Sequence, residues 1–252
     1  MNCVQMTRPL SGAPLRFGDH FFAHSFRRAD VGDPMNPLLM VDHFWMKRDT
    51  FGWHPHRAFS AVTYVFEDSK SAHHNYDSMG SDLPIRPGSL HWMVAGSGAE
   101  HCERPEGPDA LVHGLQVFVD LPDPLKAASP YTIHVESEDV PEVVGDRTRL
   151  RVVAGEYQGV RSPAVLPQPF SFFDLFLEAD ASIEIPLEGG WGGGFYSVSG
   201  ELTVMVGGRV STLSQCQAIG LQLEAGSAVV TVTAARAVHA VVLAGKWVPT
   251  DY

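Results

Sequence analysis

Short runs of β-branched and aromatic residues, separated by glycine, proline, asparagine and aspartate, dominate this chain of 252 residues. Such runs are typical of β-strands joined by tight turns. They include SAVTYVF (60–66), SLHWMVA (89–95), LVHGLQVFVDL (111–121), FSFFDLFLE (170–178), FYSVSGELTVMV (195–206) and SAVVTVTAARAVHAVVLAG (227–245). No segment keeps the apolar period of a helix over several turns. We therefore predict an all-β fold with little helix.

The strand pattern is interrupted once, near the middle of the chain. LPDPLKAASP (121–130) is followed by an acidic, proline-containing stretch, VESEDVPEVVGD (135–146). We therefore expect two β-rich units, residues 1–130 and 131–252. Each has a glycine-flanked strand, PGSLHWMVAG (87–96) in the first and LEAGSAVVTV (223–232) in the second. Two stacked β-barrels would explain this weak repetition.

Charge and cysteine content argue against several classes of protein. Asp and Glu outnumber Lys and Arg by 29 to 18, and the resulting field would repel a phosphate backbone, so no direct nucleic-acid binding is expected. Cys3, Cys102 and Cys216 are odd in number and widely spaced, which favours a reducing compartment over a disulfide framework. We find no secretory signal and no run that could span a bilayer. A cytoplasmic protein without a membrane segment is expected.

Potential metal ligands are concentrated in the first unit, because ten of the twelve histidines precede residue 120. In GWHPHRAF (52–59), His54 and His56 are two residues apart, and in an extended strand they would point to the same side. Pro55 cannot donate to a β-ladder, so this segment is expected at an edge, a strand start or a barrel rim. A rim is accessible to substrate.

A second pair with the same spacing, His101 and Glu103, occurs in GSGAEHCERP (96–105). Imidazole with carboxylate suits iron, manganese, cobalt or nickel, and zinc is a further candidate. The two pairs together would supply three nitrogens and one oxygen and leave one or two positions open, as a catalytic metal requires. One His-x-His pair alone is also common among surface or core histidines. The second pair is what favours a metal site.

Long, ordered motifs surround both pairs. They are NPLLMVDHF (36–44), HPHRAFSAVTYVFE (54–67), DSMG (77–80), RPGSLHWMVAGSGAEHCE (86–103), GLQVFVDLP (114–122) and RVVAGEYQGVRSP (151–163). These motifs resemble those of the pirin family, within the cupin superfamily. The resemblance implies a bicupin fold, two β-barrels face to face, with one metal in the N-terminal barrel and none in the second. His54, His56, His101 and Glu103 fall on the family's metal ligands, and iron(II) is the metal that the family implies.

The resemblance also implies a function. Members similar to this chain cleave the flavonol quercetin with dioxygen, whereas eukaryotic pirins regulate transcription through protein partners. We therefore expect a dioxygenase of the quercetin 2,3-dioxygenase type that binds a small aromatic substrate and O2 at a mononuclear iron(II) site. Glu103 would take the substrate's hydroxyl proton. The alternatives are a non-catalytic metal- or redox-sensing regulator with a protein partner, and a metal-free scaffold or sugar-binding cupin.

The stretch after the first histidine pair departs from the family pattern. After HPHR the family commonly has Gly-Phe-Glu, where this chain has Ala58, Phe59 and Ser60. A spare carboxylate close to the metal is therefore expected to be missing, which leaves Glu103 as the carboxylate of the site.

Other residues near the motifs have simpler interpretations. His73 and His74 lie in a hairpin that is longer than the family's version, and both are expected to be exposed in a loop. His91, where the family often has glutamine, is expected to be a hydrogen-bonded strand histidine. Cys102 is expected to be a small buried residue that points away from the metal.

Overall fold

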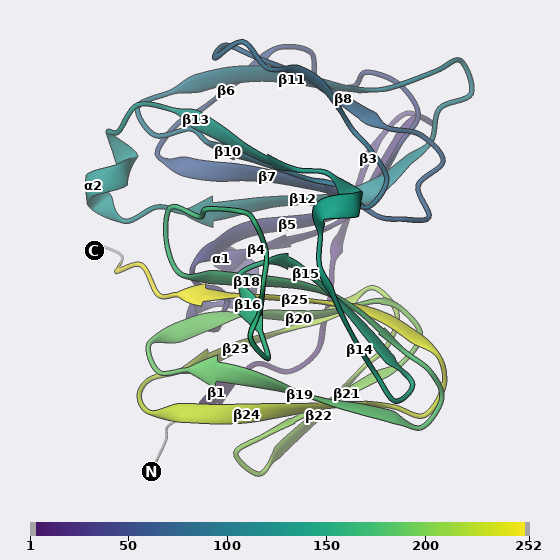
Figure 1. Cartoon of the computed structure of the whole chain (residues 1–252), viewed down its shortest axis with the longest axis vertical. Coiled ribbons are helices and arrows are strands. Elements are labelled where there is room, and N and C mark those ends of the chain that lie inside the picture. Colours follow the sequence, from purple (N-terminus) through teal and green to yellow (C-terminus); the bar gives the residue numbers. More distant parts are fainter. Residues whose placement is uncertain (1–3, 250–252) are drawn as a thin grey trace.

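The computed structural model describes residues 4–249, and its strands form four larger β-sheets, stacked in layers, and one two-stranded sheet (Figure 1). The first large sheet contains β3 (Ala13–Phe17), β4 (Phe21–Arg27), β5 (Leu38–Met46), β7 (Phe59–Val65), β10 (Leu90–Val94), β12 (Val112–Asp120) and β13 (Tyr131–Val135). Its strand order is β13-β10-β7-β12-β5-β4-β3. A smaller sheet covers it, made of β6 (His54–His56), β11 (Ala99–Pro105), β8 (His73–Asp77) and β9 (Asp82–Ile85).

The second unit repeats this plan of one large and one small sheet. The large sheet contains β1 (Val4–Met6), β23 (Gln217–Leu223), β20 (Trp191–Ser199), β25 (Val238–Lys246), β18 (Phe170–Leu177), β15 (Thr148–Ala154) and β14 (Glu142–Gly145), in that order, and β2 (Leu10–Ser11) also pairs with β23. The small sheet is β19 (Ala181–Glu188), β24 (Ser227–Ala234), β21 (Leu202–Val206) and β22 (Arg209–Leu213). A separate short hairpin joins β16 (Glu156–Tyr157) to β17 (Val160–Arg161).

Helix is limited, in residues 4–249, to the short segments α1 (Arg28–Val31), η1 (Asp33–Met35), α2 (Asp123–Lys126) and η2 (Ser137–Asp139). No helix in this range is long and apolar enough to cross a membrane. The predicted all-β bicupin fold is confirmed. Each unit consists of two facing sheets rather than one continuously paired barrel.

Sheet membership crosses the predicted division at residue 130. β1 and β2 come from the beginning of the chain but pair with β23 in the second unit. β13 follows the division but pairs with β10 in the first unit. Each unit therefore holds a strand from the other side of residue 130, and the division into 1–130 and 131–252 stays a prediction.

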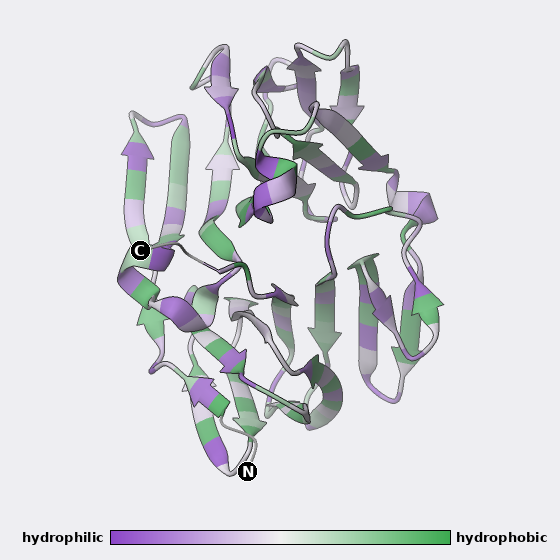
Figure 2. Ribbon diagram, turned by 90° about the vertical axis from the view of Figure 1, so that its left-hand side faces the viewer, coloured by the Kyte–Doolittle hydropathy of each residue, from purple (hydrophilic) through white to green (hydrophobic). Residues whose placement is uncertain are grey.

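The two large sheets pack face to face and form the central apolar core. Val62, Tyr64 and Leu115 from the first unit meet Phe172 and Leu243 from the second in one buried cluster. Successive residues of a strand point to opposite faces, and Figure 2 shows strands banded with apolar and polar residues along their length. The first large sheet thus gives one face to this core and the other to the interior of its own unit.

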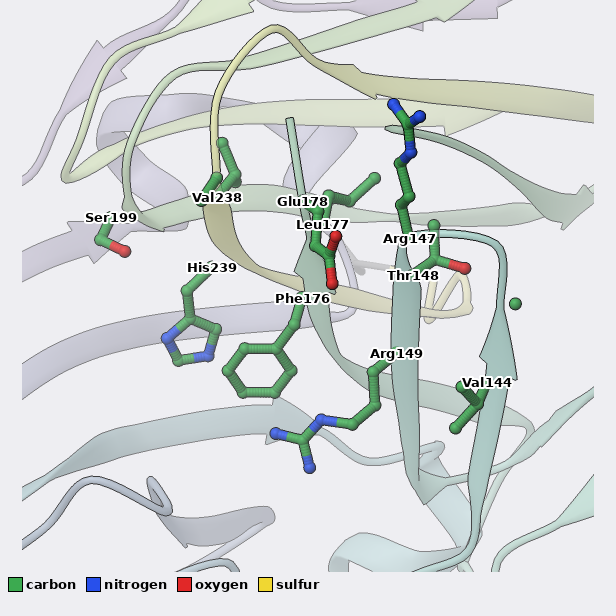
Figure 3. A pocket seen from close by; sticks show the side chains of 12 residues that line it. Val144, Arg147, Thr148, Arg149, Phe176, Leu177, Glu178, Ser199, Val238 and His239 are labelled. Atoms are coloured by element: carbon green, nitrogen blue, oxygen red, sulfur yellow. The ribbon is translucent and has the colours of Figure 1, made fainter. Parts of the chain in front are cut away.

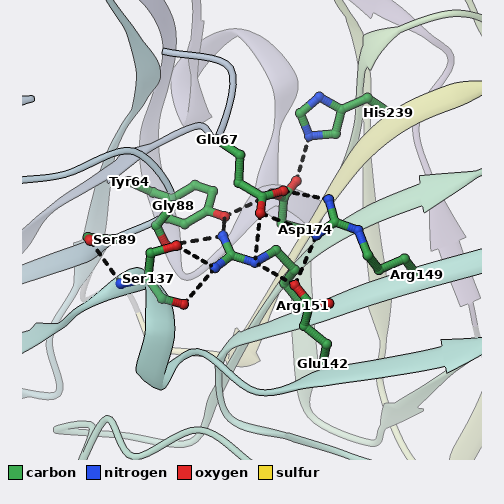
Figure 4. Close-up of polar contacts among 10 residues, drawn as sticks. All are labelled: Tyr64, Glu67, Gly88, Ser89, Ser137, Glu142, Arg149, Arg151, Asp174 and His239. Carbon is green, nitrogen blue, oxygen red and sulfur yellow. Dashed lines mark hydrogen bonds and ion pairs between the residues drawn. The ribbon is translucent and has the colours of Figure 1, made fainter. Parts of the chain in front are cut away.

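A buried arginine connects the two units at one end of this core (Figure 4). The side chain of Arg151 on β15 is only 2% exposed. Its guanidinium donates to the Tyr64 hydroxyl at 2.7 Å, to the Gly88 carbonyl at 3.1 Å and to the Ser137 carbonyl at 3.0 Å, and Nε lies 3.2 Å from a Glu142 oxygen. A buried cation requires such partners, because its desolvation is unfavourable.

The same network continues through Tyr64 to a buried carboxylate. The Tyr64 hydroxyl donates to Asp174 at 2.8 Å, and Nε2 of His239 lies 2.5 Å from the other Asp174 oxygen. Asp174 is fully buried, so Tyr64 and His239 supply the contacts that water would otherwise make. Residues from both units therefore satisfy one another's buried polar groups.

We expect Arg151→Ala to lower the free energy of unfolding by roughly 3–5 kcal/mol, because the buried partners of the guanidinium would lose their counterpart. Urea denaturation measures this change. Arg161→Ala is the matched control, since Arg161 is 77% exposed and pairs with Glu156 at the surface, and its loss is expected to be below about 1 kcal/mol. Equal losses in the two variants would contradict the role assigned to Arg151.

Candidate metal centre

Three histidine side chains converge inside the first unit. His54 and His56 come from β6 and His101 from β11, and these strands pair with His101 opposite His54. Nε2 of His101 lies 3.0 Å from Nε2 of His54 and 3.0 Å from Nε2 of His56. One ring nitrogen from each histidine lies within 4.8 Å of the others, and no second group of this kind occurs among the described residues.

Hydrogen bonds on the far side of two rings orient the converging nitrogens. Nδ1 of His54 lies 2.9 Å from the Gly52 carbonyl, and Nδ1 of His101 lies 3.2 Å from Oδ1 of Asn75 on β8. Oxygens of this type only accept, so Nδ1 carries the hydrogen and donates in both rings. Each Nε2 therefore presents a lone pair to the common point. Nitrogen lone pairs that face one another at 3.0 Å repel each other, and a cation bound between them removes this repulsion. These histidines can therefore hold a metal ion.

The electrostatics of the site favour neutral imidazoles. Burial, together with the neighbouring His101 and His54, lowers the pKa of His56 to about 3. Burial also lowers the pKa of His101, although the nearby Glu103 carboxylate opposes that shift. A metal ligand must be unprotonated, so these side chains are in the form that binds metal at neutral pH.

Glu103 lies next to the three histidines but is engaged by other groups. Its Oε1 accepts a hydrogen bond from the Thr63 hydroxyl at 2.6 Å, and its Oε2 lies 3.7 Å from Nε2 of His73. Burial would raise the pKa of Glu103, but His101, His73 and Thr63 together hold it well below its usual range. Glu103 is therefore a buried carboxylate, and its role as a fourth metal ligand stays a prediction.

His73 supports this carboxylate, and the prediction that it is exposed in a loop is wrong. The extended hairpin forms β8, which pairs with β11, so its residues alternate between the interior and the surface. His73, Asn75 and Asp77 are buried, with His73 only 1% exposed. His74 points outward and pairs with surface carboxylates. His73 and Asn75 were missed in the sequence analysis. The two-residue period of a strand over HHNYD (73–77) would have placed both side chains on the same face.

Position 60 does not belong to the metal centre. Thr63 contacts Glu103, and the ring of Phe59 lies 5.3 Å from that of His56, so the odd-numbered residues of β7 face the interior of the unit. Strand alternation places Ser60 on the opposite face, toward the core between the units. The expectation that a carboxylate at this position would lie close to the metal is therefore wrong. Ala58 has a φ of 68°, in the left-handed region that favours glycine.

Two further predictions concern single residues near the site. Cys102 is buried and alternates with His101 and Glu103, as expected of a small residue that faces away from the histidines. Cys102 and Cys216 are free thiols, and Cys3 lies outside the described residues. His91 is buried on β10, but neither of its ring nitrogens has a hydrogen-bond partner in residues 4–249, so the predicted hydrogen bond is wrong.

An apolar pocket of about 380 Å³ opens onto the histidines, between the large and small sheets of the first unit. Its polar lining consists of His54, His56, His73 and Glu103, together with Arg27, Asp42 and Gln116. Aromatic and methionine side chains form most of the remainder, namely Phe17, Phe21, Met40, Phe44, Met46, Phe51 and Phe118. Flat aromatic ligands pack well between such side chains.

A larger cavity of about 540 Å³ lies in the second unit (Figure 3). Arg149 and His239 line it, but both already have partners. Arg149 is paired with Glu67 and Glu142, and His239 is bonded to Asp174. Both side chains are thus already paired with residues of the protein. The smaller pocket, which opens onto the histidines, is therefore the better candidate for the functional site.

Comparison with known proteins gives a consistent family relationship. Residues 10–119 match the family model described as Pirin. The pirin of Homo sapiens is 32% identical over 182 residues, a match that covers 70% of this chain and 62% of the human protein. The chain thus spans less than two thirds of the length of this relative.

Solved structures share the fold of nearly the whole chain. A quercetin 2,3-dioxygenase from Acinetobacter baumannii is 23% identical with a TM-score of 0.82, and the match covers 98% of this chain and 87% of that one. The bacterial pirin YhhW from Escherichia coli, in complex with nickel(II), is 15% identical with a TM-score of 0.71, covering 98% of this chain and 100% of that one. At these identities the likeness concerns the fold.

We expect His56→Ala and His101→Ala each to weaken binding of a divalent metal by at least about a hundredfold, because each removes one of the converging nitrogens. Elemental analysis after anaerobic reconstitution and gel filtration measures the metal retained. His74→Ala is the control, since it removes a histidine that faces the surface. Equal metal content in His56→Ala and His74→Ala would exclude the proposed centre.

His91 gives a prediction for stability at acid pH. Burial lowers its pKa to about 4. His91 is therefore protonated near pH 6.5 in the unfolded chain but only near pH 4 in the folded chain. Folding stability attributable to His91 is therefore lost as the pH falls through this window. His91→Gln is expected to reduce the loss of unfolding free energy between pH 7 and pH 4.5 by on the order of 2–3 kcal/mol, as measured by urea denaturation of metal-free protein.

The control for this experiment is His74→Gln. Burial would lower the pKa of His74, but Glu106 and Asp82 raise it, so protonation of this residue stabilises the folded chain. His74→Gln should therefore leave the acid sensitivity unchanged or increase it. An acid sensitivity of His91→Gln equal to that of the unsubstituted protein would contradict the prediction.

Proposed function

Because the chain belongs to the pirin family of the cupin superfamily, we propose that it is a metal-dependent dioxygenase that cleaves a small aromatic enol, such as the flavonol quercetin, with O2. The observation that carries this proposal is the convergence of three imidazole nitrogens, two of which belong to residues that line a pocket of about 380 Å³ with aromatic walls. The fold shared with a quercetin 2,3-dioxygenase supports it.

The proposed metal ligands are His54, His56 and His101, with Glu103 as the carboxylate of the site. This donor set suits iron(II), which we propose as the native metal, and it also suits manganese, cobalt and nickel. The nickel(II) complex of YhhW, a protein of similar fold, supports the binding of a divalent ion. When bound, the metal supplies a Lewis acid for the substrate's enol oxygen and a redox partner for O2.

Glu103 is the proposed acceptor of the substrate's hydroxyl proton. It is ionised, because its neighbours hold its pKa well below the usual range. Its Oε1 is bonded to Thr63, so Oε2 is the oxygen available to the proton. Nε2 of His73 lies 3.7 Å from Oε2 and keeps the carboxylate oriented toward the pocket.

The pocket walls would orient the substrate and exclude water. The ring of Phe118 lies 5.1 Å from that of His56, and the ring of Phe44 lies 5.7 Å from that of His73. A planar substrate that reaches the histidines must therefore pack against these aromatic side chains. Such packing removes water from the reacting oxygens.

The test is oxygen uptake by protein reconstituted anaerobically with iron(II), across a panel of flavonols. We expect uptake that depends on substrate, and a decrease of about 10²- to 10⁴-fold in kcat for Glu103→Gln, because the proton acceptor is removed. His74→Ala is the control and should keep the activity. Full metal loading without uptake on any flavonol would contradict the dioxygenase. It would leave the regulatory alternative, in which binding of a protein partner depends on His56.

A further inference from the structure

A row of polar side chains crosses the first large sheet on the face that lines the pocket. From β10 to β4, one residue per strand, it consists of His91, Thr63, Gln116, Asp42 and Ser25, and each is the direct cross-strand partner of the next. Directly opposed residues project from the same face of a sheet. This polar row runs through an interior that is otherwise mainly apolar.

Four of the five residues of the polar row, all except Thr63, keep a buried atom without a hydrogen-bond partner in residues 4–249, and two neighbours among them also line the pocket. In these two neighbours the atoms are Oδ1 of Asp42, a residue that is 7% exposed, and Nε2 of Gln116. An unmade hydrogen bond of a buried group destabilises a protein, so such atoms are uncommon unless a ligand or water completes them. One of these atoms accepts and the other donates.

The other polar atoms of these two side chains lie near neighbouring polar groups. Oε1 of Gln116 lies 3.0 Å from the Thr63 hydroxyl, and the same hydroxyl contacts Glu103 at 2.6 Å. The other Asp42 oxygen, Oδ2, lies 3.9 Å from Arg27. Gln116 is therefore connected to the metal centre through a single threonine.

Aromatic side chains join the polar row to the histidines. Phe118 follows Gln116 by two residues on β12, and Phe44 follows Asp42 by two residues on β5, so each pair shares a face. Phe118 also contacts the ring of His56. A planar ligand that reaches from the histidines along these rings arrives at Asp42 and Gln116.

We propose that Asp42 and Gln116 form a hydroxyl-recognition subsite for the aromatic substrate, an inference that rests on the proposed function for the class of ligand. A phenolic hydroxyl, remote from the oxygen held at the histidines, donates to Oδ1 of Asp42 and accepts from Nε2 of Gln116. A hydroxyl is the group that satisfies both atoms at once, because it is a donor and an acceptor. A site built in this way rejects analogues that lack the hydroxyl, since its buried polar atoms are then left unpaired.

The experiment is anaerobic binding, by calorimetry, of flavonols that carry no, one or two hydroxyl groups on the pendant phenyl ring to the iron(II)-loaded protein. We expect the hydroxylated flavonols to bind at least about tenfold more tightly than the flavonol that lacks the group. Asp42→Leu and Gln116→Met, which keep the approximate shape but remove the hydrogen-bonding atoms, should each abolish this preference. His74→Ala, at a surface position outside the pocket, is the control and should keep it.

The possible results distinguish the hydroxyl-recognition subsite from the dioxygenase activity on which it rests. Equal affinity of the unsubstituted protein for all three flavonols would overturn the subsite, as would a preference that survives in either Asp42→Leu or Gln116→Met. A preference for hydroxylated flavonols without any oxygen uptake would contradict the dioxygenase and support the subsite. Failure of every flavonol to bind would overturn both. The metal content and melting temperature of each variant show that it is folded, and either variant alone is sufficient for the comparison.

Discussion

The face-to-face packing of the two large sheets is the constraint on which the rest of this structure depends. It commits one face of the first large sheet to a core shared with the second unit, through residues such as Val62 and Tyr64. Because strand residues alternate, the intervening positions, including Thr63, must line the interior of the first unit. The buried Arg151 network adds polar contacts between the units where the apolar core ends. The same packing thus stabilises the fold and orients one wall of the pocket.

The two walls of the pocket supply different chemistry. The small sheet provides His54, His56 and His101, whose nitrogens converge. The large sheet provides the polar row, in which Asp42 and Gln116 keep unpartnered atoms. The Thr63 hydroxyl connects the walls, because it contacts both Glu103 and Gln116. The three-histidine cluster on one sheet and the polar row on the other lie close together only because the sheets face each other across the pocket.

The sequence predicted features that depend on two residues of the same strand. It did not predict features that depend on a partner in another strand. The His54/His56 pair needed only the two-residue period of a strand, which is a local property. The position of Ser60 depended on which face of β7 is turned toward the three histidines, and that is decided by packing between the units. His73 was missed because the extension of its hairpin pairs with β11 as a strand, which local composition did not reveal. The exchange of β1 and β13 between the units is a long-range effect of the same kind.

The sequence by itself determined the all-β class, the bicupin relationship and the same-face spacing of the histidine and glutamate pairs. These follow from local periodicity and from motifs that are contiguous in the chain. Only the tertiary structure decided that His101 meets His54 and His56, that Glu103 is engaged by Thr63 and His73, and that a polar row crosses the sheet. The members of that row are far apart in the sequence. Cross-strand register brings them together, and register is set by the packing of whole sheets rather than by any local pattern.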